Sequence, residues 1–283
     1  MARNNGDRLG APAGMGGDAP IGDTPPNPMM AFATPTTFVE LPSKGALYPE
    51  GHPMYGREQL EIRFMTAKEE DILTSQALLK KGIAIDRMLQ SVILDKGIRV
   101  EQLAVGDKNA IIVAARISGY GSDYEVAVNC PSCSAQVDYS FDLEKITYNY
   151  GEDVEDFDVR KTEAGTFMIK TPSLKAEVEM RPMYGADETY LAQLAINRNK
   201  KNLPSTTLID QLKRLVLSVN GSTDPAMRES FISNAPAMDT RYLRRAYKKI
   251  SPNIDMTQEF TCSSCGAETE MAVPLTAKFF WAQ

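Results

Sequence analysis

Apolar and polar positions recur with two different periods along the chain, and each period predicts one kind of element. Apolar residues three or four positions apart predict helices over Ile72–Leu79, over Ile85–Ile93 and from Asp107 onward. Thr66-Ala-Lys-Glu69 is a capping-box sequence that predicts where the first helix begins, and Lys80-Lys81-Gly82 is typical of a helix end. Alternation at every second position predicts strands, which cover Glu125–Asn129, Val137–Phe141, Val154–Arg160 and Thr166–Thr171.

Helical periodicity returns in the second half of the chain. Ser205 is expected to cap a helix that continues through Val219 and ends at Asn220-Gly221. A last helix is expected to begin at Asp239, with Leu243, Ala246 and Ile250 facing inward. Together these patterns predict an α+β fold.

The order of these elements occurs twice, with matching residues at similar distances. The matched pairs, in chain order, are Pro42 and Pro172, Arg63 and Arg181, Gly97 and Gly221, Asp107 and Asp239, Cys130 and Cys262, and Leu143 and Leu275. Several matches in one order are typical of internal duplication. We therefore expect two related copies of a strand–three-helix–strand unit, the first half (residues 38–150) and the second half (residues 151–283).

Residues 1–37 differ in composition from everything that follows. The segment holds six Gly and six Pro and almost no branched or aromatic residues. Such a segment buries too little apolar surface to offset the entropy lost on ordering. We interpret it as a flexible arm, and two roles stay open: a disordered terminus, or an arm that orders against a neighbour in an assembly.

All four cysteines lie in two Cys-x-x-Cys pairs, Cys130/Cys133 and Cys262/Cys265, each between two predicted strands. A Cys-x-x-Cys turn directs two thiolates at one metal, and two such turns complete the four-sulfur tetrahedral set that structural zinc prefers. The 128 residues between the pairs exceed the usual zinc-ribbon spacing, but related copies that each end in one turn would bring them together. We expect one structural Zn²⁺ per chain; a redox dithiol, buried free thiols and an iron–sulfur site are the alternatives.

Charge and composition disfavour several classes of function. The 283 residues carry a formal net charge of −6 and a single histidine, His52. No Lys or Arg occurs from 117 to 144 or from 250 to 277, the stretches that contain the cysteine turns, so phosphate binding there is not expected. Neither a membrane segment nor a catalytic set or phosphate loop is recognisable, so we expect neither nucleic acid nor membrane as a partner, and no enzyme.

Two features are left over as candidate partner-binding surfaces. The first is basic and lies on the last predicted helix: Arg241, Arg244, Arg245, Lys248 and Lys249. It is a solvated face, a site for an acidic protein, or a site for nucleic acid. The second is aromatic and ends the chain: Phe279, Phe280 and Trp281. These side chains either pack back on their own chain or anchor a neighbouring subunit.

Two long strings carry a family resemblance, Phe38-Val-Glu-Leu-Pro-Ser-Lys-Gly45 and Glu61-Ile-Arg-Phe-Met-Thr-Ala-Lys-Glu-Glu-Asp-Ile-Leu73. Further matches are Tyr48-Pro-Glu-Gly51, Gly106-Asp-Lys-Asn-Ala110, Ala115-Arg-Ile-Ser-Gly-Tyr-Gly121 and Phe141-Asp-Leu143 beside the first cysteine turn. The chain resembles the baseplate hub subunit family of contractile-tailed (T-even-like) bacteriophages, most strongly over residues 38–143.

The resemblance implies a non-enzymatic hub component that helps to build the baseplate, located in the virion tail and, during assembly, in the host cytoplasm. It implies other baseplate and hub proteins, and the tape-measure protein, as partners. A transient tail-assembly chaperone absent from the mature virion is the alternative. A zinc-ribbon regulator of nucleic acid is a further alternative that the missing cations disfavour.

Overall fold

The computed structural model describes residues 33–152, 154–274 and 279–280, and residues 34–283 form one compact unit. Most of the predicted arm, together with Leu275 and Trp281, lies outside the described residues.

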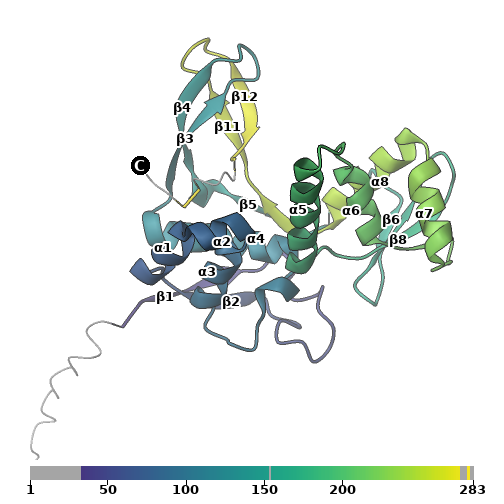
Figure 1. The fold of residues 1–283 in the computed structure, drawn as a ribbon, viewed down its shortest axis with the longest axis horizontal. Helices are drawn as coiled ribbons and strands as arrows, with labels where there is room; N and C mark the ends of the chain where they lie inside the picture. The colour runs from purple at the N-terminus through teal and green to yellow at the C-terminus, as the bar shows by residue number, and fades with distance from the viewer. Residues whose placement is uncertain (1–32, 153, 275–278, 281–283) are drawn as a thin grey trace, which may run out of the picture. The chain divides into compact units, whose positions relative to one another are not determined.

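The first half begins with a strand pair followed by helices (Figure 1). Strands β1 (Thr36–Glu40) and β2 (Gln59–Arg63) are antiparallel and enclose the turn-rich segment that links them. The helices that follow are α1 (Ala67–Thr74), α2 (Gln76–Lys81), α3 (Ala84–Val92), the short η2 (Val100–Gln102) and α4 (Val105–Tyr120). Directly after α3, Ile93 forms a single antiparallel bridge with Ile62 of β2.

The second half is built around a four-stranded antiparallel sheet. Its order is β6 (Val159–Lys161), β7 (Phe167–Lys170), β8 (Glu177–Met180) and β9 (Val216–Val219). The helices of this half are α5 (Gly185–Lys200), α6 (Thr207–Leu215), α7 (Pro225–Asn234) and α8 (Ala237–Ile250). Strand β9 follows α6 at once and pairs with β8, in the same order in which Ile93 follows α3 and meets β2.

Each half ends in a two-stranded hairpin, and one short strand pair joins the halves. The hairpins are β3 (Asp123–Asn129) with β4 (Gln136–Asp142), and β11 (Thr257–Thr261) with β12 (Glu268–Ala272). After the first hairpin, η3 (Leu143–Lys145) leads into β5 (Thr147–Asn149), which pairs with β10 (Asn253–Asp255) of the second half. Figure 1 shows the two hairpins side by side.

The structure is mixed α and β, as predicted, but several element predictions are wrong. The helix expected over 72–79 is two helices that meet at Ser75, and the described residues of each half carry four α-helices instead of three. Val216–Val219 is a strand because β8 offers it an unpaired edge, which local periodicity does not reveal. Residues 154–158 are not a strand, and neither α5 nor α7 was predicted.

Buried apolar residues of both halves form one core. Polar contacts also join the halves where the start of α4 meets the start of α5. The backbone N–H of Val105 donates to Met183 O, and the N–H of Gly185 donates to Leu103 O, both at 2.9 Å. Lys108 of α4 pairs with Asp86 at 2.7 Å and with Glu188 of α5 at 3.0 Å. None of the described helices is both long enough and apolar enough to cross a membrane.

Candidate metal centre

The two hairpins bring all four cysteines to one point. The sulfur atoms of Cys130, Cys133, Cys262 and Cys265 all lie within 4.8 Å of one another. Two sulfur pairs from opposite hairpins, Cys130 Sγ with Cys265 Sγ and Cys133 Sγ with Cys262 Sγ, are each 3.9 Å apart. Cysteines 129 and 135 positions apart in the chain therefore form one cluster.

The two cysteine turns have the same backbone geometry. The N–H of Cys130 donates to Ala135 O at 2.9 Å, and the N–H of Cys262 donates to Ala267 O at 3.0 Å. The residue after the second cysteine is left-handed in both turns, Ser134 with φ 60° and Gly266 with φ 71°. In each turn that residue donates its N–H to the carbonyl of the first cysteine. Glycine is suited to this conformation, and the first turn accommodates serine instead.

Away from the cysteine turns, side chains of the two hairpins pack against each other and form hydrogen bonds between them. The Tyr139 ring packs edge-on between Phe141 and Phe260, with centroids 4.8 and 4.9 Å away, and its hydroxyl donates to Glu259 O at 3.1 Å. The amide group of Gln258 donates to Asp142 O at 2.7 Å. The thiol cluster is thus positioned by a packed interface between the hairpins.

The sulfur spacing fits a tetrahedral metal and does not fit disulfides. Four sulfurs about 2.3 Å from a Zn²⁺ ion would lie about 3.8 Å apart, whereas a disulfide needs about 2.05 Å. All four cysteines are free thiols in the structure. Cys130 and Cys262 are buried and Cys133 and Cys265 are exposed, so the protein covers one side of the cluster. These four residues can hold a metal ion.

The environment of Cys130 favours its ionised form. The backbone N–H of Cys133, supported by that of Ser132, lowers the pKa of the Cys130 thiol to about 6, although burial opposes this. The Ser132 N–H lies 3.4 Å from Cys130 Sγ. At Cys265 the Ala267 N–H lowers the thiol pKa, but hydrogen bonds with Cys133 and Cys262 outweigh it and raise the pKa to about 12. Thiolates are the form in which cysteine binds metals, and within this cluster Cys130 is the thiol whose surroundings favour that form.

Phe279 and Phe280, the described residues of the aromatic end, are buried within this chain. Phe279 and Phe280 are 3% and 2% exposed, and Phe279 packs edge-on against Tyr124 at 5.0 Å. The Nε–H of Arg116, itself 1% exposed, donates to Phe279 O at 2.9 Å. Phe279 and Phe280 therefore do not present their rings to a partner. No local pattern indicated that Arg116 would be buried beside them.

The predicted basic face does lie on the surface of α8. Arg241, Arg245, Lys248 and Lys249 are exposed and Arg244 is half-buried. Arg245 lies over the Phe157 ring at 5.7 Å. Among the described residues, no ion pair is formed by Arg241, Arg244, Arg245 or Lys248.

Other repeated residues of the sequence have equivalent structural tasks. Arg63 makes two bonds to Glu69, at 2.9 and 2.6 Å, and Arg181 makes two to Asp187, at 2.7 and 2.8 Å. Both carboxylates also accept an N–H from the residue three positions earlier, at the start of a helix. The capping box predicted at Thr66 and Glu69 is thus present, with its carboxylate also paired to an arginine.

The matched aspartates at the starts of α4 and α8 are buried turn anchors. Asp107 accepts the N–H and the hydroxyl of Ser43 at 2.9 and 2.6 Å, and Asp239 accepts the N–H of Ser173 at 2.8 Å. Tyr48 donates a further bond of 2.6 Å to Asp107. Both aspartates are fully buried. Burial raises the pKa of Asp107 above its ordinary value.

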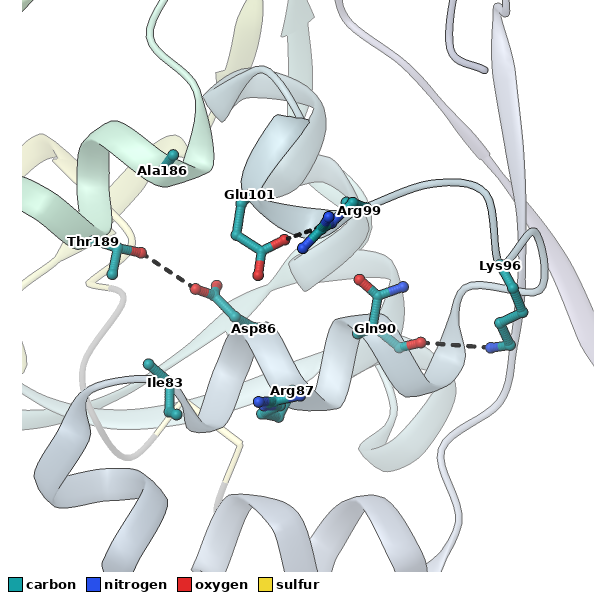
Figure 2. A pocket seen from close by; sticks show the side chains of 9 residues that line it. All are labelled: Ile83, Asp86, Arg87, Gln90, Lys96, Arg99, Glu101, Ala186 and Thr189. Carbon is teal, nitrogen blue, oxygen red and sulfur yellow. Dashed lines mark hydrogen bonds and ion pairs between the residues drawn. The ribbon is translucent and has the colours of Figure 1, made fainter. Parts of the chain in front are cut away.

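A charged hollow of about 590 Å³ lies between α3, the segment up to η2 and the start of α5 (Figure 2). Figure 2 shows the side chains of Asp86 and Thr189 directed at each other, and Arg99 beside Glu101. Lys96 donates to Ile93 O at 2.6 Å, at the end of α3. Ser, Cys and His are all absent from the residues that line this hollow, and the Thr189 hydroxyl lies within hydrogen-bond distance of Gly185 O, at 3.1 Å, and of Asp86 Oδ2, at 3.4 Å.

Comparison with protein families gives one match. Residues 34–281 match the family described as T4 bacteriophage base plate protein. Neither the search of curated proteins nor that of solved structures found a match.

Proposed function

Because the chain belongs to the T4 bacteriophage base plate protein family, we propose that it is a structural, non-enzymatic component of the baseplate hub that acts in tail assembly. The observation that carries this proposal is the family match, which covers almost all of the described residues. Family membership implies a place in the virion tail and contact with other baseplate proteins. The hub position rests on the resemblance of residues 38–143.

The cysteine cluster supports a structural metal in this role. We assign it one Zn²⁺ per chain, held by Cys130, Cys133, Cys262 and Cys265. Four protein ligands leave no open position for water or substrate, which is the arrangement of structural zinc sites. Since two ligands come from each half, the metal would join the end of the first half to the end of the second.

The repeated contacts support an internal duplication. The arginine–carboxylate pairs, the buried aspartates and the cysteine turns occur in the same order in both halves. A duplicated unit explains why zinc ligands lie 128 residues apart, because each copy supplies one cysteine turn.

The acidic surface of the hairpins favours a protein partner over nucleic acid. Their exposed side chains include Glu125 and Asp138 on the first hairpin and Glu259, Glu268 and Glu270 on the second. These carboxylates would repel a phosphate backbone. Partners in the hub, with the tape-measure protein among the candidates, fit this acidic surface better than DNA or RNA does.

Mass spectrometry of purified virions, isolated baseplates and assembly intermediates tests the role. A hub component should be present in all three, at a fixed ratio to other baseplate proteins. Its recovery from intermediates but not from virions would favour the transient chaperone. Absence from both baseplates and intermediates would overturn the proposal.

A further inference from the structure

The second half contains an apolar groove that the function described so far does not use. It has a volume of about 350 Å³ and lies between α6, α8 and the end of β8, beside the start of α4. Six aliphatic side chains line it: Val105 of α4, and Met180, Met183, Leu208, Leu212 and Leu215. Leu208 is 51% exposed, so the groove is accessible from solvent.

In the first half, the two helix positions that match Gln211 and Arg244 of this groove carry buried apolar side chains. Met88 lies four positions before the end of α3, as Gln211 does in α6, and Met88 is completely buried. Ile112 lies five positions after Asp107, as Arg244 does after Asp239, and Ile112 is 8% exposed. Where the first half has two buried apolar residues, the second half has Gln211 and Arg244 on the lining of a groove.

The rim of the groove is cationic. Arg244 and Lys248 line it from α8, and none of the described residues that line it carries a carboxylate. Arg244 uses its Nε–H for Thr240 O at 3.3 Å, and neither cation forms an ion pair within the described residues. The chain as a whole is acidic, yet this apolar lining carries two cations and no carboxylate beside them.

From this geometry we propose that the groove binds an acidic amphipathic segment of another baseplate protein, a proposal that rests on the assembly role above. Aliphatic side chains of that segment pack against the apolar residues that line the groove. One or two of its carboxylates pair with Arg244 and Lys248, since arginine binds carboxylates with parallel hydrogen bonds. Recognition by apolar anchors together with an arginine cluster is a known mode of peptide binding.

Site-specific crosslinking in infected cells tests which molecule occupies the groove. The photoreactive residue p-benzoylphenylalanine replaces Leu208, which lines the groove, or Ile209, which is 40% exposed but does not line it. We expect a crosslink from position 208 to one baseplate protein, at a segment that combines Asp or Glu with aliphatic residues. Position 209 should give at most one tenth of that yield.

Charge reversal on α8 tests the rim. The double variant Arg244→Glu/Lys248→Glu should reduce the position-208 crosslink about tenfold or more, because both carboxylate contacts become repulsive. Lys200→Glu reverses an exposed charge of α5 outside the groove and should leave the yield unchanged. Metal content and Tm of each variant show that the fold is intact.

Three outcomes would overturn the groove proposal. The first is a crosslink from position 208 to residues 1–32 or to a second copy of this chain. The second is equal yields at positions 208 and 209, and the third is no crosslink in particles that contain the protein. If the chain is instead missing from baseplates and from assembly intermediates, the assembly role itself fails.

Discussion

The two halves of the molecule share their buried polar anchors but differ in how they close. Each half fixes a strand to a helix start through an arginine–carboxylate pair, Arg63 with Glu69 and Arg181 with Asp187. Each also anchors a Pro-Ser turn on a buried aspartate. In the first half Met88 and Ile112 are buried, whereas the matching positions of the second half, Gln211 and Arg244, line a groove.

This difference suggests that buried polar groups and apolar side-chain volume determine different features of the fold. Buried charged and hydrogen-bonded groups tolerate little change, because an unpaired buried charge is costly. Apolar side chains are more easily exchanged for others, so the two halves can differ in packed volume and still keep the same buried polar contacts, which we call the frame. The frame sets where helices and strands lie, and the side-chain volume decides whether a helix pair forms core or surface.

The largest effect should come from the cysteine cluster, to which each half contributes two cysteines. Cys130→Ser and Cys262→Ser should each release the metal and lower Tm by about 10 °C or more, because structural zinc contributes on the order of 10 kcal/mol in small domains. Elemental analysis and calorimetry measure the two effects, with Ser264→Ala in the same turn as the control. Unequal metal loss in the two variants would contradict a shared site, and metal-free protein from reducing, chelator-free purification would exclude it.

Substitution of Arg63 or Arg181 should show that the two arginine–carboxylate pairs differ in how much they stabilise the fold. Arg63→Met leaves the fully buried Glu69 carboxylate without a cation, and such a change typically costs about 3–5 kcal/mol. Arg181→Met should cost about 1–2 kcal/mol less, because Arg214 Nε remains 2.6 Å from Asp187 Oδ1. Urea denaturation measures both, and the exposed Arg160→Met should stay within about 0.5 kcal/mol of wild type. Equal losses for Arg63 and Arg181 would show that Arg214 does not compensate.

Substitution of two glycines of α4 tests how closely the chain is packed at two places. Gly106 lies at the junction between the halves, and Gly119 lies within the first half. A Cβ on Gly106 would lie 2.1 Å from Pro252 O, so Gly106→Ala should cost about 1–3 kcal/mol as the backbones separate. A Cβ on Gly119 would meet only the Met65 side chain, at 3.4 Å. Gly119→Ala should therefore be neutral, or stabilise by about 0.5–1 kcal/mol through helix propensity. Thermal unfolding measures both, and tolerance of Gly106→Ala would argue against close packing at the junction.

The smallest expected effect is a difference in acid stability. Although burial opposes it, hydrogen bonds from Arg63, Ser91 and Thr66 lower the pKa of Glu69 from 4.5 to about 2. Its stabilising effect is therefore complete above pH 4.5 and is lost as pH falls toward 2. The Tm difference between wild type and Glu69→Gln should shrink over this range, with Glu125→Gln on exposed β3 as a control for the lost charge. A difference that does not change with pH would show that Glu69 acts through packing alone.

The sequence was sufficient for the features that depend on local chemistry. The capping box at Thr66 and Glu69, the hairpins around both cysteine turns and the helix starts near Asp107 and Asp239 agree with the structure. Each of these is encoded within a few neighbouring residues. The clustering of all four cysteines was also predicted, because their repeated spacing placed one turn in each half.

Only the tertiary structure decided the features in which a distant segment supplies the energy. Val216–Val219 has helical periodicity but becomes strand β9 because β8 offers it backbone hydrogen bonds. Phe279 is exposed or buried according to whether Tyr124 and Arg116 lie beside it, 155 and 163 positions earlier in the chain. The groove beside α6 exists because Gln211 and Arg244 meet there, and no local pattern shows that they do. Local sequence fixes turns, caps and ligand pairs, whereas long-range pairing and side-chain volume determine what is covered.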